Sequence, residues 1–332
     1  MPENRPPSSR SPWIAERVSV RVPATSANLG PGFDCLALAL SLSNTFDVAL
    51  DHDRRGTSEV TIRGDRRDTA CLTEPNDNLF LRAFTMACQS RDVAVPRMRL
   101  TMHVNLPPGR GLGSSATAVV GGIIAANALL GNPLTQADML DLAVRCEPGH
   151  HPDNVAAALL GGLVITGVRN AEGRLIAERV ALNRAARAVV FIPDMPMSTL
   201  EGRSLLPPAY AREDVTFNLS RVALLVAGLH SGRFDLLGLA MDDRMHQPYR
   251  QKLFPALPDL ISAAREGGAL GACLSGGGSS VLALVDGEEN RVRDAMTAEA
   301  RRLGIAGDCV IADIAHDGAL ATIMTPMAVG DE

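Results

Sequence analysis

The sequence predicts a mixed fold, α+β or α/β, with two domains. Patterns typical of strands and of helices occur together in both halves of the chain. The length of 332 residues fits about two domains of ordinary size. Hydrophobic residues make up 46% and charged residues 21% of the chain, which is the composition of a folded globular protein.

The first half begins with residues 1–16, which are rich in Pro, Ser and Arg and are expected to be a disordered tail. Alternating or continuous apolar residues then predict strands at 17–22, 46–50, 59–63, 98–104 and 161–168. Helical spacing predicts a helix at 76–89 with Asn76 as its N-cap. The same spacing predicts further helices at 114–130, 135–146 and 152–160.

The second half opens with an apolar strand at 187–193. Two apolar runs that flank three glycines predict a strand, a turn and a second strand within 269–285. Helical spacing predicts helices at 198–206, 216–231, 233–243, 256–266 and 287–303, before a last strand at 309–314. A boundary near residue 190 would leave residues 17–190 in the first domain and 191–332 in the second.

Charge and lysine content exclude several classes of protein. The net charge of -5 at pH 7 argues against nucleic-acid binding, because no excess of cationic surface is available. Lys252 is the only lysine, and no glycine-rich loop lies near it in the sequence. The lysine that a Walker-type loop or a protein kinase places on the phosphates is therefore missing. A Schiff-base enzyme would have to use Lys252 itself.

Cysteine usage and hydropathy predict a cytoplasmic protein that binds no membrane. The six cysteines form no C-x-x-C pair and most lie in apolar segments, so we expect buried thiols in a reducing compartment. No signal peptide is visible at the N-terminus. The longest mostly apolar run, residues 116–130, is too short to span a bilayer.

The segment "PPGRGLGSSAT" joins a predicted strand to an apolar helix through a glycine loop. Gly109, Gly111 and Gly113 let the backbone turn tightly and approach a ligand. The free N–H groups and the dipole at a helix N-terminus favour phosphate, so this is the strongest candidate for a phosphate site. A structural loop capped by Ser114 is the alternative. The candidate ATP-binding residues here are Pro107, Pro108, Gly109, Arg110, Gly111, Leu112, Gly113, Ser114, Ser115, Ala116 and Thr117.

Three further segments gather polar side chains or glycines. "PATSANLGPGFD" (23–34) holds several polar residues between turn-formers, and an ordinary polar turn is an equal alternative. "EPGHHPDN" (147–154) clusters acids, histidines and an amide without a standard zinc spacing, and the first turn of a helix after Pro152 is its alternative. "LSGGGSSV" (274–281) predicts either a plain hairpin or a backbone that approaches a ligand closely.

Taken together, these segments resemble the three motifs of the GHMP kinase superfamily, in the right order. Within the superfamily, "VPATSANLGPGFDCLALAL", "HPDNVAAALLGG", "STLEGRSLLP" and "DDRMHQPYR" are most similar to homoserine kinases. The resemblance runs from residue 17 to about residue 325. It implies a two-domain α+β fold with the active site in the inter-domain cleft. It also implies ATP-dependent phosphorylation of the L-homoserine hydroxyl in threonine biosynthesis, with Mg²⁺ as cofactor.

The resemblance further implies roles for single residues. Asp153 and Asn154 would be catalytic, and we expect positioning rather than base catalysis because an ordinary carboxylate is a weak base for an alcohol. Ser115 and Glu147 would hold Mg²⁺. Many homoserine kinases carry this acid two residues before the histidine, whereas Glu147 stands four before His151, and a Pro-Gly bulge could restore its position. Asn78 is expected in the adenine pocket. The homoserine site would comprise Asn28, Asp34, His151, Asp153, Thr199, Arg203, Arg250 and Gly277.

Two other functions stay open. A mevalonate- or shikimate-type GHMP kinase would bind a carboxylate but no ammonium group. A non-catalytic sensor with this fold is disfavoured because the glycine loop and the catalytic polar residues are intact. A dinucleotide-binding oxidoreductase is excluded, since no G-x-G-x-x-G opens the first β–α turn. The expected partner is the small-molecule substrate, and a homodimer is an open expectation.

Overall fold

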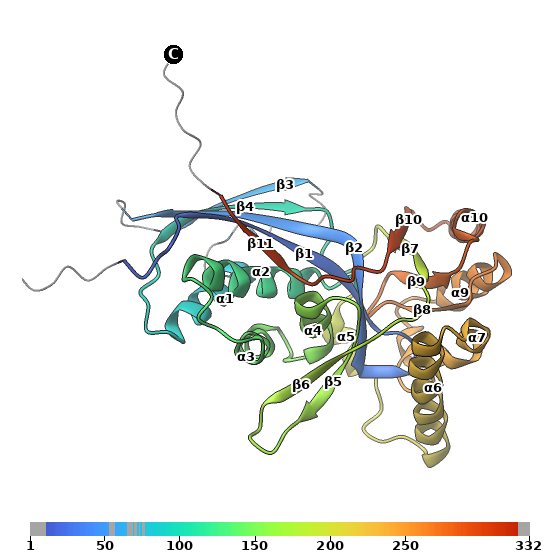
Figure 1. Cartoon of the computed structure of the whole chain (residues 1–332). Helices are drawn as coiled ribbons and strands as arrows, with labels where there is room; N and C mark the ends of the chain where they lie inside the picture. The colour runs from blue at the N-terminus through green and yellow to red at the C-terminus, as the bar shows by residue number, and fades with distance from the viewer. Residues whose placement is uncertain are drawn as a thin grey trace, which may run out of the picture.

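The computed structural model describes residues 11–52, 57–64, 69, 72, 74 and 77–324. Within these residues the strands form two sheets, one of seven strands and one of four. Figure 1 shows helices α1–α4 on one face of the seven-stranded sheet, with the second sheet and its helices at the other end of the molecule. None of the helices in this part of the chain is long and apolar enough to cross a membrane.

The seven-stranded sheet builds the N-terminal lobe. Its strands are β1 (Arg17–Asn28), β2 (Gly32–Asp51), β3 (Glu59–Gly64), β4 (Arg97–Val104), β5 (Leu163–Arg169), β6 (Leu175–Val180) and β11 (Leu320–Ile323). The order is β11-β1-β2-β4-β3, and β5 pairs with both β2 and β6. Only the β3–β4 pair is parallel. The covering helices are α1 (Leu79–Gln89), α2 (Ser114–Leu129), α3 (Gln136–Cys146) and α4 (Pro152–Leu160).

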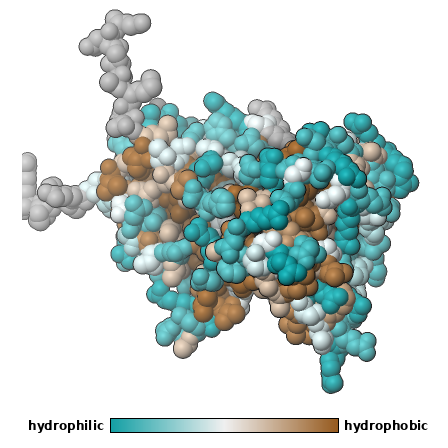
Figure 2. Space-filling view, turned by 45° about the vertical axis from the view of Figure 1, so that its right-hand side comes forward, coloured by the Kyte–Doolittle hydropathy of each residue, from teal (hydrophilic) through white to brown (hydrophobic). Residues whose placement is uncertain are grey.

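The four-stranded antiparallel sheet builds the C-terminal lobe, in the order β10-β7-β9-β8. Its strands are β7 (Arg187–Pro193), β8 (Gly271–Leu274), β9 (Val281–Val285) and β10 (Gly307–Asp313). The helices of this lobe are α5 (Thr199–Ser204), α6 (Arg212–Ser231), η2 (Phe234–Leu236), α7 (Leu237–Ala240), α8 (Gln247–Arg250), α9 (Leu257–Glu266) and α10 (Glu289–Arg302). Hydrophilic residues cover most of the molecular face in Figure 2, as expected of a chain folded around internal cores.

Most predicted elements are confirmed, but β1 and β2 are longer than predicted. Residues 23–28, expected to belong to a loop, continue β1 and pair with residues of β2. Thr25 and Ser26 are fully buried there, so this stretch lacks the polar–apolar alternation that marks a half-exposed strand. The edge strands β6 and β11 were not predicted; they are short and mostly exposed, and pairing with β5 and β1 holds them.

Both chain ends and the lobe boundary differ in detail from the expectation. Residues 1–10 lie outside the described residues; residues 11–16 are mostly exposed but contact the N-terminal lobe. The Trp13 ring stacks on Phe84 with centroids 6.1 Å apart, and the Ile14 N–H donates to the Leu129 carbonyl at 2.9 Å. Residue 190 falls inside β7, which pairs wholly within the second sheet, and β11 returns to the first sheet. Strand pairing therefore divides the lobes between β6 and β7.

An apolar cluster joins the two lobes. It contains Leu36, Leu38 and Leu40 from β2, all at most 1% exposed, together with residues of β7, β9, α6 and α7. The backbone continues this contact, since the Ala315 N–H donates to the Ala39 carbonyl at 3.0 Å. Because water is excluded along this seam, the lobes hold a fixed relative position and can share a site between them.

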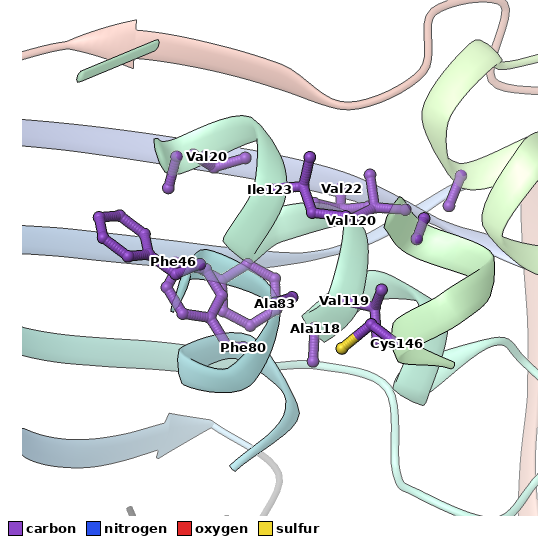
Figure 3. Packing of buried hydrophobic residues seen from close by; sticks show 14 of the residues in the cluster. Val20, Val22, Phe46, Phe80, Ala83, Ala118, Val119, Val120, Ile123 and Cys146 are labelled. Carbon is purple, nitrogen blue, oxygen red and sulfur yellow. The ribbon is translucent and has the colours of Figure 1, made fainter. Parts of the chain in front are cut away.

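The core of the N-terminal lobe lies between the sheet and its helices. Figure 3 shows Phe46 from β2 and Phe80 from α1 near each other beside α2, and their ring centroids are 5.0 Å apart. Helix α2 is apolar on nearly all sides because α1, α3, α4 and β1 surround it. Gly122 lets α1 approach closely, since a Cβ there would lie 2.3 Å from the Phe80 carbonyl oxygen.

The close α1–α2 contact predicts the effect of Gly122→Ala. Alanine favours a helix by about 1 kcal/mol over glycine. We nevertheless expect a loss of about 1–3 kcal/mol of unfolding free energy, because the new methyl group forces the two helices apart. Urea unfolding followed by circular dichroism measures this change. A variant more stable than the wild type would contradict the close packing.

Candidate active site

A cavity of about 360 Å³ opens between the two lobes. Polar residues from the N-terminal lobe line one side, and α5, α8 and the loop after β8 supply the other. Its apolar end is formed by Phe46, Leu72, Leu79, Met102 and Val104. The cavity thus combines a flat apolar pocket with a strongly polar region, as a bound nucleotide and a small polar molecule would require.

The glycine loop forms one wall of this cavity and ends at the start of α2. Gly111 and Gly113 have φ values of 74° and 67°, in the left-handed region that favours glycine. Gly113 is the N-cap of α2 and provides no side-chain capping bond. The first N–H groups of this buried helix are therefore available to an anion, supported by the helix dipole.

The glycine loop is fastened to the loop after β8. The Ser275 hydroxyl donates to the Gly111 carbonyl at 2.7 Å, and the Ser280 N–H donates to the Arg110 carbonyl at 3.0 Å. A Cβ at Gly111 would lie 2.1 Å from the Ser275 carbonyl oxygen, so only glycine fits. These contacts hold the two glycine-rich motifs backbone to backbone across the lobe boundary.

The side chains of two residues expected to bind ATP make structural contacts. The Arg110 side chain, 1% exposed, donates to the carbonyls of Pro108 at 2.6 Å and of Asp194. It therefore anchors the loop to the C-terminal lobe. Asn78 is the N-cap of α1: its oxygen accepts the Leu81 N–H, and its amide donates to the Leu72 carbonyl at 2.7 Å. In the structure the N-cap of α1 is thus Asn78. The predicted N-cap, Asn76, lies outside the described residues.

The acidic side of the cavity contains Glu147 beside Ser115. The Ser115 hydroxyl donates to Oε1 of Glu147 at 2.6 Å, and Oε2 is buried without a partner. The two extra residues after Glu147 form a bulge, in which Gly149 and His150 adopt φ values of 80° and 56°. Glu147 itself is the C-cap of α3, just before these residues, and lines the cavity. Burial raises the pKa of Glu147 to about 7, and the Asp153 carboxyl also raises it.

Asp153 and Asn154 lie in the first turn of α4 and point toward the glycine loop. Oδ1 of Asp153 accepts from the Asn154 backbone N–H at 2.7 Å, and Oδ1 of Asn154 accepts from the Thr25 hydroxyl at 2.7 Å. Burial raises the pKa of Asp153 to about 6, followed by the effect of the Asp34 carboxylate. The network fixes the orientation of both side chains next to the start of α2.

The opposite side of the polar region is built from two arginines. Arg203 on α5 forms a bidentate ion pair with Asp34, one bond of which is 3.0 Å long. Nη1 of Arg250 donates to the Gly276 carbonyl at 3.0 Å and to Nδ1 of His246 at 3.2 Å. The Nε groups of both arginines are buried without a partner. Burial, and then the Arg203 charge, lower the pKa of Arg250 to about 10, so its guanidinium stays charged at neutral pH.

The remaining candidates also reach the cavity. Asn28 donates to the Gly276 carbonyl at 2.9 Å and accepts the Asp34 N–H at 3.1 Å. His151, Thr199 and Gly277 line the cavity as well. Burial lowers the pKa of His151, which favours a neutral imidazole. Among the described residues, no three side chains of His, Cys, Asp or Glu form a group that could hold a metal ion by themselves.

Sequence reasoning missed Asn44 in this cavity wall. Its oxygen accepts the N–H groups of Asn105 and Leu106, and its amide donates to the Thr117 hydroxyl at 2.9 Å. Asn44 therefore joins β2 to both ends of the glycine loop. In the sequence Asn44 is a single polar residue just before the strand predicted at 46–50, and such a residue is too common to mark a site.

Comparisons with known proteins identify the fold. The family described as "GHMP kinases N terminal domain" matches residues 78–162. The family described as "GHMP kinases C terminal" matches residues 225–303. A solved homoserine kinase from Cytophaga hutchinsonii is 28% identical with a TM-score of 0.83, covering 93% of this chain and 98% of that chain. L. major mevalonate kinase shares the fold at 17% identity and a TM-score of 0.68, covering 92% of this chain and 99% of that chain. The fold and the glycine-loop cavity are those of a GHMP kinase.

Curated relatives identify the family within the GHMP kinases. Homoserine kinase from Synechococcus sp. is 41% identical over 303 residues, which cover 91% of this chain and 97% of the relative. Homoserine kinase from Moorella thermoacetica is 41% identical over 296 residues, covering 89% and 96%. The chain belongs to the homoserine kinase family of the GHMP kinases.

Gly113→Val tests the glycine loop. A Cβ at this position would lie 2.0 Å from Oγ1 of Thr25, and valine strongly disfavours the left-handed backbone. We expect the affinity for ATP to fall by about 100-fold or more, because the α2 N–H groups lose their alignment with the phosphates. Isothermal titration calorimetry with ATP measures this affinity. Wild-type affinity in a folded variant would contradict the phosphate site.

Glu147→Gln tests the buried acid through the pH dependence of stability. In the unfolded chain Glu147 ionises near its ordinary pKa of 4.5, whereas in the fold it stays protonated until about pH 7. Unfolding is therefore favoured increasingly as pH rises between these values. We expect the variant to gain about 2–3 kcal/mol more over the wild type at pH 8 than at pH 5. Equal differences at both pH values in chemical denaturation would contradict the raised pKa.

Proposed function

We propose that this chain transfers the γ-phosphoryl group of ATP to the side-chain hydroxyl of L-homoserine. The observation that carries the proposal is the pair of buried, unpartnered Nε groups on Arg203 and Arg250, beside the carboxylate of Asp34. A buried N–H without an acceptor is costly, so this region favours an anionic ligand. A neighbouring carboxylate favours a cation. An amino acid carries both charges on one carbon.

Homoserine would exchange partners with the Arg203–Asp34 ion pair. Its carboxylate would accept from the two guanidinium groups, which match a planar carboxylate better than lysine would. Its ammonium group would take the place of Arg203 beside Asp34 and Asn28. Thr199 and Gly277 would bound the same subsite, and His151 would orient the chain that carries the hydroxyl. The ammonium group would thus replace the guanidinium charge beside Asp34, and the substrate carboxylate would replace the Asp34 charge beside Arg203. Each displaced charge is replaced by one of the same sign.

ATP would place its triphosphate along residues 107–117 and its adenine against the apolar end of the cavity. Without a lysine on the loop, backbone N–H groups and a metal ion must offset the phosphate charge. Ser115 and the unpartnered Oε2 of Glu147 fit Mg²⁺, because this ion prefers hard oxygen ligands and keeps several waters. When bound, Mg²⁺ would neutralise charge on the phosphates.

Asp153 and Asn154 would position the acceptor hydroxyl rather than remove its proton. Phosphoryl transfer through a loose transition state depends mainly on alignment and charge stabilisation. With its pKa near 6, Asp153 is largely ionised at neutral pH and remains far too weak a base to ionise an alcohol beforehand. Its bond to Asn154 holds it rigidly, which supports an orienting role for both residues. The bond from the homoserine oxygen to the γ-phosphorus would form as the bond to ADP breaks, and the hydroxyl proton would pass to an oxygen of the transferred phosphoryl group.

The alternative substrates fit this subsite less well. Mevalonate and shikimate would satisfy the arginines, but they offer no cation to Asp34 once Arg203 is engaged. A non-catalytic sensor is disfavoured, because the glycine loop, Glu147 and Asp153 all face one cavity. A cytoplasmic location and a homodimer remain predictions.

A panel of acceptors tests the function. Purified protein with ATP and Mg²⁺ should release ADP with L-homoserine and far more slowly with mevalonate, shikimate or galactose, since only homoserine carries both charges. A coupled ADP-release assay measures this, with O-phosphohomoserine identified by mass spectrometry. Comparable or faster turnover of mevalonate or shikimate would contradict the proposal.

Arginine variants test the carboxylate subsite in the same assay. Arg203→Leu and Arg250→Leu should each raise the KM for homoserine about 10–100-fold, the loss expected for a hydrogen bond to a charged group. The KM for ATP should barely change. Arg244→Leu is the matched control, because Arg244 lies in the same segment but pairs with Asp214 on the surface. Unchanged homoserine KM values in both site variants would rule out the arginine subsite.

A further inference from the structure

One aromatic ring contacts both arginines of the candidate carboxylate subsite. The guanidinium carbons of Arg203 and Arg250 lie 5.1 Å and 5.4 Å from the centroid of the Phe33 ring. The His246 imidazole stacks on the same ring, with centroids 5.3 Å apart and planes inclined by 27°. Phe33 is therefore the common neighbour of three groups from α5, α8 and the residue that precedes α8.

The two arginines are hydrogen-bonded through their terminal nitrogens, and the Phe33 ring is a further contact for both guanidinium groups. Arg203 is bonded through its two terminal nitrogens to Asp34, and Arg250 through Nη1 to Gly276 and His246. Nε of each is buried without a partner. A guanidinium within about 6 Å of an aromatic centroid is attracted to the ring, which also restricts its rotation.

His246 ties Arg250 to the turn between β1 and β2 (residues 29–31), which leads into Phe33 near the start of β2 and is called the Phe33 turn below. Because arginine can only donate, Nδ1 of His246 must accept from it, and Nε2–H donates to the Gly30 carbonyl at 2.7 Å. The imidazole is thus in its neutral Nε2–H form, consistent with a pKa lowered by complete burial. Movement of the Phe33 turn would therefore also displace Arg250.

The Phe33 turn is itself held firmly. Asn28, Leu29 and Asp34 all adopt positive φ values, of 70°, 48° and 59°. Such backbone persists only when its surroundings fix it. Here the Asn28 oxygen accepts the Asp34 N–H at 3.1 Å, and the Asn218 amide donates to the Pro31 carbonyl at 3.2 Å. The ring therefore has a defined position from which to order the arginines.

We propose that Phe33 is a positioning residue for substrate binding: its ring holds the Arg203 and Arg250 guanidinium groups next to each other, so that both donate to one carboxylate when the substrate ammonium group replaces Arg203 beside Asp34. This inference rests on the proposed function, because it assumes a substrate with a carboxylate. The ring does not contact the reacting hydroxyl or phosphate in this scheme. Its loss should therefore weaken substrate binding and leave the phosphoryl-transfer step nearly intact.

Phe33→Leu tests the inference by separating KM from kcat. Two cation–π contacts at a partly buried site suggest a rise of about 5–30-fold in the homoserine KM. We expect kcat to change less than about 3-fold and the KM for ATP less than about 2-fold. Phe33→Tyr, which keeps the ring, should restore a KM near the wild-type value. Phe33→Met fills similar space without a ring and replaces Phe33→Leu if that variant does not fold.

Phe217→Leu is the matched control. Arg221 and Arg244 also lie over the Phe217 ring, at 3.7 Å and 4.0 Å from its centroid, but Phe217 is not among the residues that line the cavity. This variant removes a comparable pair of contacts and should leave the homoserine KM unchanged. A rise in KM equal to that of Phe33→Leu would overturn the inference, since the effect would then not be specific to the substrate arginines.

A double-mutant cycle shows whether Phe33 acts through the arginines. In an Arg250→Leu background, Phe33→Leu should lower kcat/KM for homoserine less than it does in the wild type. Fully additive losses would overturn the inference, as would an unchanged KM in folded Phe33→Leu. If the wild type does not phosphorylate homoserine, the proposed function fails and this inference with it. If the wild type does so and only the Phe33 effects are missing, the proposed function stands.

Discussion

The site depends on the backbone contact between two glycine loops from different lobes. Gly111 lies against Ser275 so closely that a Cβ would come within 2.1 Å of its carbonyl oxygen. The Ser275 hydroxyl adds bonds to Ser26 at 2.8 Å and to the Gly111 carbonyl at 2.7 Å. This contact fixes the start of α2 opposite Gly276 and Arg250. The distance between the glycine-loop side and the arginine side of the cavity follows from it.

The cavity contains charged and polar groups whose hydrogen-bonding capacity is not fully used by neighbouring residues. Glu147 and Asp153 are buried acids with raised pKa values, and both arginines have an unpartnered Nε. Such groups cost folding free energy, which the apolar packing between the lobes offsets. Nucleotide, metal ion and substrate are the partners that would satisfy them. The residues that lower the stability of the fold are thus the ones that would make the site selective for its ligands.

Local patterns predicted the elements whose apolar face is clear, such as α1, β4 and α10. They failed where pairing partners rather than local spacing stabilise the chain. The edge strands β6 and β11 are mostly exposed and exist because β5 and β1 supply hydrogen bonds. Residues 23–28 form a strand because they are buried between neighbours, and Trp13 is ordered because Phe84 lies beside it.

The sequence by itself determined the three motifs, their order, and the residue types that we propose bind phosphate and an amino acid. Only the tertiary structure decided the direction of each side chain. The Arg110 side chain donates to backbone carbonyls, and the Glu147 carboxyl at the end of α3 accepts from the Ser115 hydroxyl in the cavity wall. The Phe33 ring contacts two arginines that are distant from it in the sequence. The reason is physical: a side chain's rotamer follows from contacts with residues distant in sequence, such as Asp34 with Arg203, which local spacing does not encode.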